Sequence, residues 1–188
     1  MIERPTGSQQ RFSGPVKDEM SADMTEIYEE IEKSRPGTGI KGPFGPWLAS
    51  PGFCGAAQNL GRVCRYELMH LTKMESELAI MVGAIHYKAS TEWEIHYPEA
   101  IKAGISEQIL EQIEAGDIDS DAIFDYNTRE ECIMSFTQHC LIDSENLPDD
   151  LYDRCKEQLG DAGLVELVGI TGYYALVAMT LNVFKIKP

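Results

Sequence analysis

The sequence contains 188 residues, 43% of them hydrophobic, and its 31 acidic and 16 basic side chains give a formal charge of −15. A chain of this length can bury one hydrophobic core, so we expect a single domain over residues 1–188. An acidic exterior repels a phosphate backbone and an anionic membrane surface. We therefore expect neither nucleic acid nor a membrane as a partner.

Two further features predict a soluble protein of the cytoplasm. No run approaches the length of about 18 apolar residues that marks a membrane span, and the first ten residues are mostly polar where a secretory signal needs an apolar core. The cysteines are odd in number and form no Cys-x-x-Cys pair, which predicts reduced thiols rather than disulfides or a zinc knuckle. The five cysteines are Cys54, Cys64, Cys132, Cys140 and Cys155.

Residues 1–50 are expected to form an N-terminal arm, one short helix and a loop rich in proline and glycine. Residues 18–34 have apolar side chains at helical spacing, and Ser21 or Asp23 is placed to cap the helix. The loop over residues 37–52 holds Phe44 and Trp47, whose rings must pack on something. Loops of this kind also cover active-site pockets.

Residues 53–184 show helical periodicity almost throughout and no convincing strand alternation, so we predict an all-α core. Its last helix is apolar on nearly all sides, as expected of a helix at the centre of a bundle or in a subunit interface. The expected helices cover residues 53–70, 73–103 with a break near 88–91, 106–116, 122–141, a segment opening at Asp149, and 164–184.

The candidate catalytic residues lie between Lys73 and His96 and comprise two glutamates and two histidines, Glu77, His86, Glu92 and His96. Glu92 and His96 stand four residues apart, so their side chains share one face of a helix and could share a proton or a substrate. Each residue also has a structural interpretation: Glu77 could offset a helix dipole, and His96 could be a hydrogen-bonded core histidine.

Several pieces of the sequence resemble the carboxymuconolactone decarboxylase family, which includes the alkylhydroperoxidase D-like proteins. These pieces are ELAIMVGA, HYKASTEWEIH followed by PEAIKAGIS, and LVELVGITGYYALVAMTLNVFKI, and the resemblance runs in order from about Cys54 to Phe184. It implies an all-α bundle of about seven or eight helices, an active site around the helix pair at residues 73–103, and a homo-oligomer such as a dimer, trimer or hexamer.

The chain departs from the peroxidase branch of this family at the redox centre. The signature of that branch is Glu, eleven residues, Cys, two residues, Cys, three residues, His; counted from Glu77, the cysteine positions fall on Ala89 and Glu92 and the histidine on His96. Peroxide reduction at this site requires a thiolate and a resolving thiol, which alanine and glutamate cannot replace.

The remaining residues suggest an acid-base enzyme without metal or cofactor, acting by decarboxylation or lactone chemistry on a small organic acid or lactone. Nearby carboxylates are expected to raise the pKa of His96 above its ordinary value, making it a charged proton donor. Two alternatives stay open: a hydroperoxide reductase that uses the cysteines outside the motif, and a catalytically silent oligomeric binding protein of the same fold.

Four further residues are candidates for substrate binding: Trp93, Trp47, Arg62 and Arg65. An arginine can anchor a substrate carboxylate, although solvated salt bridges or packing explain all four equally well. A metal site is not expected, because di-metal sites in helical bundles use a Glu-x-x-His motif repeated on two helices, and this stretch lacks that repeat.

Overall fold

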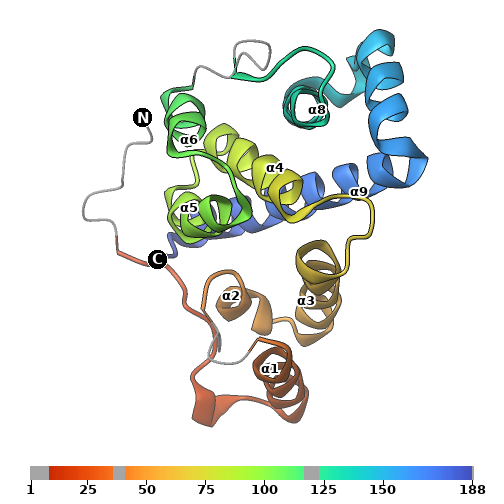
Figure 1. The fold of residues 1–188 in the computed structure, drawn as a ribbon. Coiled ribbons are helices and arrows are strands. Elements are labelled where there is room, and N and C mark those ends of the chain that lie inside the picture. The colour runs from red at the N-terminus through yellow and green to blue at the C-terminus, as the bar shows by residue number, and fades with distance from the viewer. Residues whose placement is uncertain (1–8, 36–40, 117–122, 188) are drawn as a thin grey trace.

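The computed structural model describes residues 9–35, 41–116 and 123–187. Within these ranges the chain forms eight α-helices, two short 3-10 turns and no strand, which confirms the predicted all-α class. The helices, labelled as in Figure 1, are α1 (Ala22–Ser34), α2 (Phe44–Leu48), α3 (Pro51–Tyr66), α4 (Lys73–His86), α5 (Ser90–Ala103), α6 (Glu107–Ala115), α8 (Arg129–Asp143) and α9 (Asp149–Phe184), and the 3-10 turns are Lys17–Glu19 and Ser144–Asn146.

The helix boundaries follow local signals in the sequence. Ser21 caps α1 and Ser106 caps α6 by accepting a hydrogen bond from a backbone N–H of the first turn. Thr72 begins α4 with a capping box, in which Glu75 bonds back to the Thr72 backbone. Gly104 and Gly116, both in the left-handed conformation, end α5 and α6.

The predicted break between the two site helices occurs at residues 87–89. Lys88 takes a left-handed conformation with φ of 51°, and the chain turns back so that α5 packs against α4. Asn182 of α9 donates a 2.7 Å hydrogen bond to the carbonyl of Tyr87, which fixes the turn. The reversal places the start of α4 opposite the middle of α5.

Three helices differ from the prediction. The segment expected as an irregular loop contains the short helix α2, and α3 begins at Pro51 rather than at Phe53. The helix expected over residues 122–141 begins at Arg129, because Asn127 has φ of 61° and Thr128 caps the helix through the N–H of Glu131; Ala122 lies outside the described residues. The two segments expected from Asp149 and over 164–184 are both present, because α9 consists of two helical parts joined at a kink at Gly160 (φ 70°, ψ 171°).

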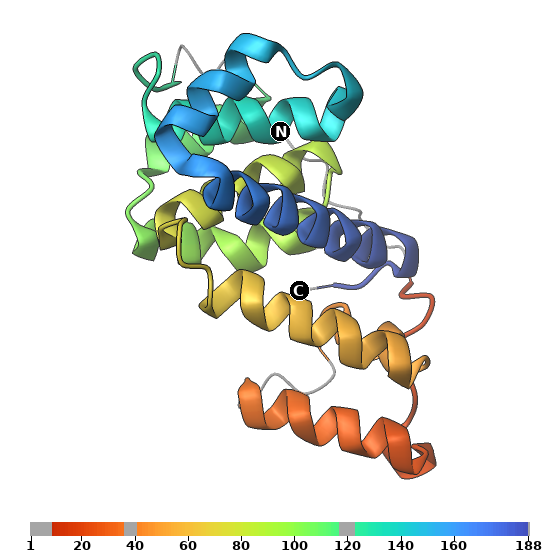
Figure 2. The ribbon, with the colours of Figure 1, turned by 90° about the vertical axis from the view of Figure 1, so that its right-hand side faces the viewer.

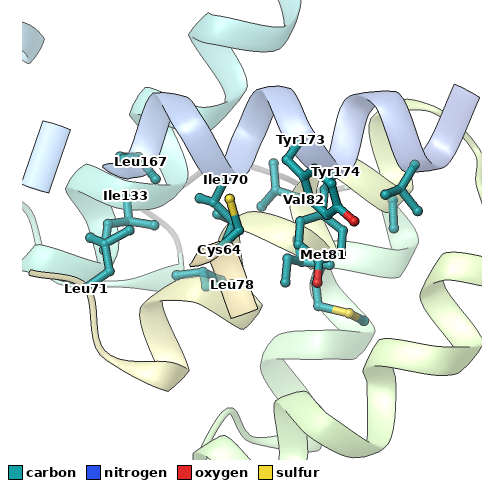
Figure 3. Close-up of a cluster of buried hydrophobic side chains, with 14 of the residues drawn as sticks. Cys64, Leu71, Leu78, Met81, Val82, Ile133, Leu167, Ile170, Tyr173 and Tyr174 are labelled. Carbon is teal, nitrogen blue, oxygen red and sulfur yellow. The ribbon is translucent and has the colours of Figure 1, made fainter. Parts of the chain in front are cut away.

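Helix α4 is central, packing against α5, α6, α8 and α9 (Figure 1). Buried side chains of α4, including Leu78, meet Ile170 and its neighbours from α9, with Cys64 contributed by α3 (Figure 3). Ile170 is fully buried, and complete burial of such a side chain contributes about 1.5–3 kcal/mol. The apolar pattern of α4 and α9 therefore fixes the positions of the polar residues that interrupt it.

Helix α9 is long and apolar enough to cross a membrane by length and composition alone. In this fold 56% of its most apolar window is buried within the protein, as in the core helix of a bundle. Figure 2 shows the second part of α9 running beside α3.

The N-terminal arm is attached to the end of α9. Arg11 donates backbone and side-chain hydrogen bonds, both 3.0 Å, to the carbonyls of Phe184 and Val183. The ring of Phe12 packs at 6.1 Å from that of Phe184. Segments more than 170 residues apart are thus joined at one end of the bundle.

Candidate active site

The α4 and α5 helices bring Glu77 and His96 into direct contact. The Nδ1 atom of His96 lies 2.8 Å from Oε2 of Glu77, and both side chains are buried. The other carboxylate oxygen, Oε1, accepts a hydrogen bond from Nζ of Lys73, one helical turn earlier on α4. Glu77 therefore connects a buried histidine to a lysine that reaches the surface.

Burial and hydrogen bonding decide the charge of this pair. Burial opposes ionisation of Glu77, but the hydrogen bonds from His96 and Lys73 outweigh it and hold the pKa of Glu77 below its ordinary value. For His96 burial is the larger effect, and it lowers the pKa although Glu77 acts in the opposite direction. The expectation of a raised pKa for His96 is therefore wrong, because it counted nearby charge and omitted the loss of water.

The resulting state is an ionised Glu77 beside a neutral His96. An ionised carboxylate can only accept, so Nδ1 of His96 carries the proton and donates it in the hydrogen bond. The other ring nitrogen, Nε2, then keeps its lone pair. His96 can therefore act as a base by accepting a proton at Nε2.

His96 lines a cavity of about 790 Å³ between α3, α5 and α9. The ends of the described chain complete its wall: Gln10 and Ser13 come from the arm, and Lys187 from the residues after α9. Residues 41–43, which precede α2, and Phe44 at the start of α2 also line it.

Glu92 lies on the same cavity wall, in the first turn of α5. Its side chain is 1% exposed, and no described residue hydrogen-bonds to either carboxyl oxygen. Burial raises the pKa of Glu92 well above its ordinary value. Glu92 and His96 therefore face one cavity from one helix, as their spacing predicted.

The charge of the cavity wall is opposite to that of the whole chain. Among the described residues that line it, Glu92 is the single acidic side chain, whereas Arg35, Lys41, Arg65 and Lys187 are basic. Cations facing a shared concave space favour an anionic ligand.

Two adjacent tyrosines of α9 contribute to the aromatic part of the wall, together with Phe44 and Tyr66. The ring of Tyr174 meets the His96 ring edge to face, with centroids 5.0 Å apart at 89°. Tyr173 packs at 5.2 Å from Tyr174, and Trp47 supports it from behind at 6.2 Å. Trp47 is itself held by a 3.0 Å hydrogen bond from Nε1 to Oγ1 of Thr180.

The structure therefore brings together four of the eight predicted site residues, Glu77, Glu92, His96 and Arg65, with Glu77 behind His96. The other four lie outside the cavity wall. His86 packs against Tyr87, Trp93 packs against Tyr97, Arg62 pairs with Glu67, and Trp47 supports Tyr173.

Sequence reasoning missed several residues of the cavity. Tyr173 and Tyr174 could have been found, because two hydroxyl groups interrupt an otherwise apolar helix. Arg35, Lys41 and Lys187 carry no such signal, since only folding brings them to the cavity.

Most of the cysteine side chains are buried in the core. Cys54, Cys64, Cys132 and Cys155 are buried, and burial raises the pKa of Cys54 and of Cys64 to about 11. Over the ranges that the structure covers, no group of three or more His, Cys, Asp or Glu side chains is placed to hold a metal ion.

Comparison with known proteins gives structural relatives only. No family model matches the sequence, and no curated protein matches it significantly. A peroxidase-related protein with the alkylhydroperoxidase AhpD core from Ralstonia eutropha JMP134 is similar with a TM-score of 0.75 and 14% identity, over 95% of this chain and 91% of that one. An uncharacterized peroxidase-related protein from Silicibacter sp. TM1040 has a TM-score of 0.76 and 11% identity, over 98% and 95% of the two chains.

A third relative is a characterised enzyme. A cysteine-to-alanine variant of the debrominase Bmp8, solved with 2,3,4-tribromopyrrole, is similar with a TM-score of 0.71 and 9% identity, over 96% of this chain and 92% of that one. Sequence identities this low are evidence for a shared fold and carry no evidence about activity. The chain thus has the alkylhydroperoxidase D-like helical fold, as the resemblance to the carboxymuconolactone decarboxylase family implied.

Proposed function

We propose that this protein is a cofactor-free acid-base enzyme that decarboxylates a small organic acid or performs related lactone chemistry. One observation carries the proposal: the buried Glu77 and His96 pair opens onto a cavity whose wall also holds Glu92 and Arg65. The fold is one that also supports an enzyme, the debrominase.

The charge of the cavity supports an acidic substrate. The guanidinium of Arg65 faces the same space as His96 and can hold a carboxylate by paired hydrogen bonds. Arg35 has a structural role, because its guanidinium donates hydrogen bonds to the side-chain oxygen (3.2 Å) and to the backbone carbonyl (2.9 Å) of Gln58. Arg65 is thus our candidate for the substrate anchor.

Decarboxylation is a reaction that this set of groups can assist. The bond to the carboxylate breaks, carbon dioxide leaves, the electron pair moves into an adjacent carbonyl, and a proton returns to carbon. His96 at Nε2 can take up or relay protons during these steps, since Glu77 stabilises the imidazolium that forms.

The test is turnover of organic acids by the purified protein, measured by mass spectrometry as loss of a carboxyl group. In His96→Gln the titrating nitrogen is removed at similar size, and kcat should fall by roughly two to four powers of ten. His86→Gln is the matched control, because His86 lies outside the cavity wall, and it should keep its activity. A folded His96→Gln protein with full turnover would contradict the proposal.

Peroxide reduction through Cys54, Cys64 and Cys140 is disfavoured, because burial raises the pKa of each thiol. Cys155 lowers the pKa of Cys132, but both of these cysteines are buried and neither lines the cavity. We expect no dithiol-dependent consumption of peroxide, and a variant lacking all five cysteines should keep its turnover of the organic acid. Loss of that turnover in a folded cysteine-free protein would favour the thiol chemistry instead.

A further inference from the structure

Glu92 occupies an unusual position for a carboxyl group. Its side chain is 1% exposed, both oxygens are buried, and within the described part of the chain neither oxygen takes part in a hydrogen bond or ion pair. It nevertheless borders the 790 Å³ cavity. A core glutamate kept for structure usually has partners, as Glu131 has in Arg154 and Ser135.

An ionised carboxylate in this position would be strongly destabilised. Transfer of a bare carboxylate out of water is so costly that a buried group takes up a proton instead. The charged and titratable groups that face the cavity from the other packed elements are Arg35, Lys41, Arg65, Tyr66, Tyr173, Tyr174 and Lys187, and none of them hydrogen-bonds to Glu92. Burial without a partner therefore favours the neutral carboxylic acid form of Glu92.

The neighbouring His96 is in the complementary state. It lies one turn further along α5, donates its Nδ1 proton to Glu77, and keeps a lone pair on Nε2. Residues four apart on a helix lie above one another on one face. At neutral pH the helix therefore holds a proton donor and a proton acceptor side by side on one cavity.

We propose that Glu92 is the proton donor of the reaction and that His96 is the base. This assignment rests on the proposed function and reverses the role expected for His96 from the sequence. In the decarboxylation the bond between carbon and carboxylate breaks, carbon dioxide leaves, and the electron pair forms an enolate. The proton of Glu92 moves to the enolate carbon. Nε2 of His96 then takes a proton from the water that converts the released carbon dioxide into bicarbonate, and His96 returns this proton to the Glu92 carboxylate, which restores both groups.

The protonation state is tested without a substrate. Infrared spectra of the native protein at neutral pH should contain the C=O stretch of a neutral carboxylic acid, which shifts in deuterium oxide and disappears in Glu92→Gln. Glu94→Gln, the same change at an exposed position of α5, should keep the band. A native spectrum without the band would overturn the assignment, because an ionised Glu92 has no proton to donate.

The transfer step is tested with the acid identified by the turnover experiment. Glu92→Gln still donates a hydrogen bond but transfers no proton, so kcat should fall by roughly two to four powers of ten while KM stays unchanged. Glu92→Asp, which keeps an acid, should retain more of kcat than Glu92→Gln. Full kcat in Glu92→Gln would overturn the role of Glu92.

The failures of the two proposals are distinguishable. Loss of activity in His96→Gln together with full activity in Glu92→Gln would leave the acid-base enzyme in place and remove Glu92 as its donor. A native protein that turns over no organic acid would overturn the proposed function and with it the transfer step. The infrared band would then still decide whether Glu92 is neutral.

Discussion

Burial acts on Glu92 and His96 in the same physical way and moves their pKa values in opposite directions. It disfavours the charged form of each, so the pKa of the carboxyl group rises and that of the imidazole falls. Glu77 limits the fall for His96, since its negative charge and hydrogen bond favour the imidazolium. The Glu77 carboxylate should therefore tune the activity of His96.

Glu77→Gln tests this effect of the carboxylate on His96. Removal of the carboxylate should lower the pKa of His96 further, and a base is active only when unprotonated. The acid limb of the kcat/KM profile should therefore move to lower pH, a shift that Glu94→Gln should not produce. Profiles of the native and Glu77→Gln proteins that coincide on the acid side would assign Glu77 a structural role.

Glu92→Gln should change how the stability of the protein depends on pH. Because the folded-state pKa of Glu92 is raised, the stability it contributes is complete below its ordinary value of 4.5 and is lost as pH rises towards the folded-state pKa. Glutamine has no such penalty, so Glu92→Gln should be more stable than the native protein at neutral pH, and the difference should grow from about pH 4.5 upward. Thermal unfolding over this range measures it; two parallel curves would contradict a buried neutral acid.

The sequence predicted residue identities at the site better than their charge states. The spacing of Glu77, Glu92 and His96 within one motif was enough to place them together. The sign of the His96 pKa shift was not predictable, because it depends on how completely Tyr174 and the rest of the fold exclude water. Burial is a property of the assembled helices and not of a local pattern.

The packing of the helices depends on glycine positions as well as on the apolar core. Gly61 of α3 lies against Tyr173 of α9, and a Cβ atom at this position would collide with the tyrosine hydroxyl. The absence of a side chain is what lets α3 approach α9 and bring Arg65 and Tyr173 to one cavity.

We therefore predict that Gly61→Ala lowers the free energy of unfolding by about 1–3 kcal/mol, the range for overpacking. Urea denaturation would measure the change. The control is Gly52→Ala on the same helix, where a Cβ atom meets nothing within 4 Å and alanine should stabilise by about 0.4–1 kcal/mol. Equal effects of the two substitutions would show that the Tyr173 side chain can move aside without lowering the free energy of unfolding.

Helix existence was more predictable than helix extent. Apolar periodicity and capping residues identified α1, α3, α4, α5 and α6, because these signals act within a few residues. The short helix α2 and the late start of α8 were missed. The start of α8 depends on a single residue, Asn127, that adopts positive φ in its folded context.

For the whole molecule, α9 leaves an apolar stripe on the surface. Val165, Val168, Met179 and Val183 are 72%, 52%, 46% and 55% exposed, and their spacing places them along one side of the helix. A stripe of this kind is typical of a subunit interface. We propose that the protein forms a homo-oligomer through this stripe.

Light scattering should find an oligomer, and Val168→Asp should shift it towards monomer. Ile142→Asp on α8, at a position 75% exposed and outside this stripe, should leave the assembly unchanged. Because copies with a formal charge of −15 repel one another, added salt should strengthen the association. A native protein that stays monomeric at micromolar concentration would refute this assembly.

The clasp between the N-terminal arm and the end of α9 couples ordering of the arm to binding. Arg11 and Phe12 hold the arm to residues 183–184, and Gln10 and Ser13 beside them border the cavity. Suppose that a ligand touches Gln10 or Ser13 and binds more tightly when the arm is attached. Thermodynamic reciprocity then requires that the bound ligand increases the equilibrium constant for attachment of the arm by the same factor. Slower hydrogen exchange at the Arg11 amide would then report occupancy of a cavity that the amide itself does not enter.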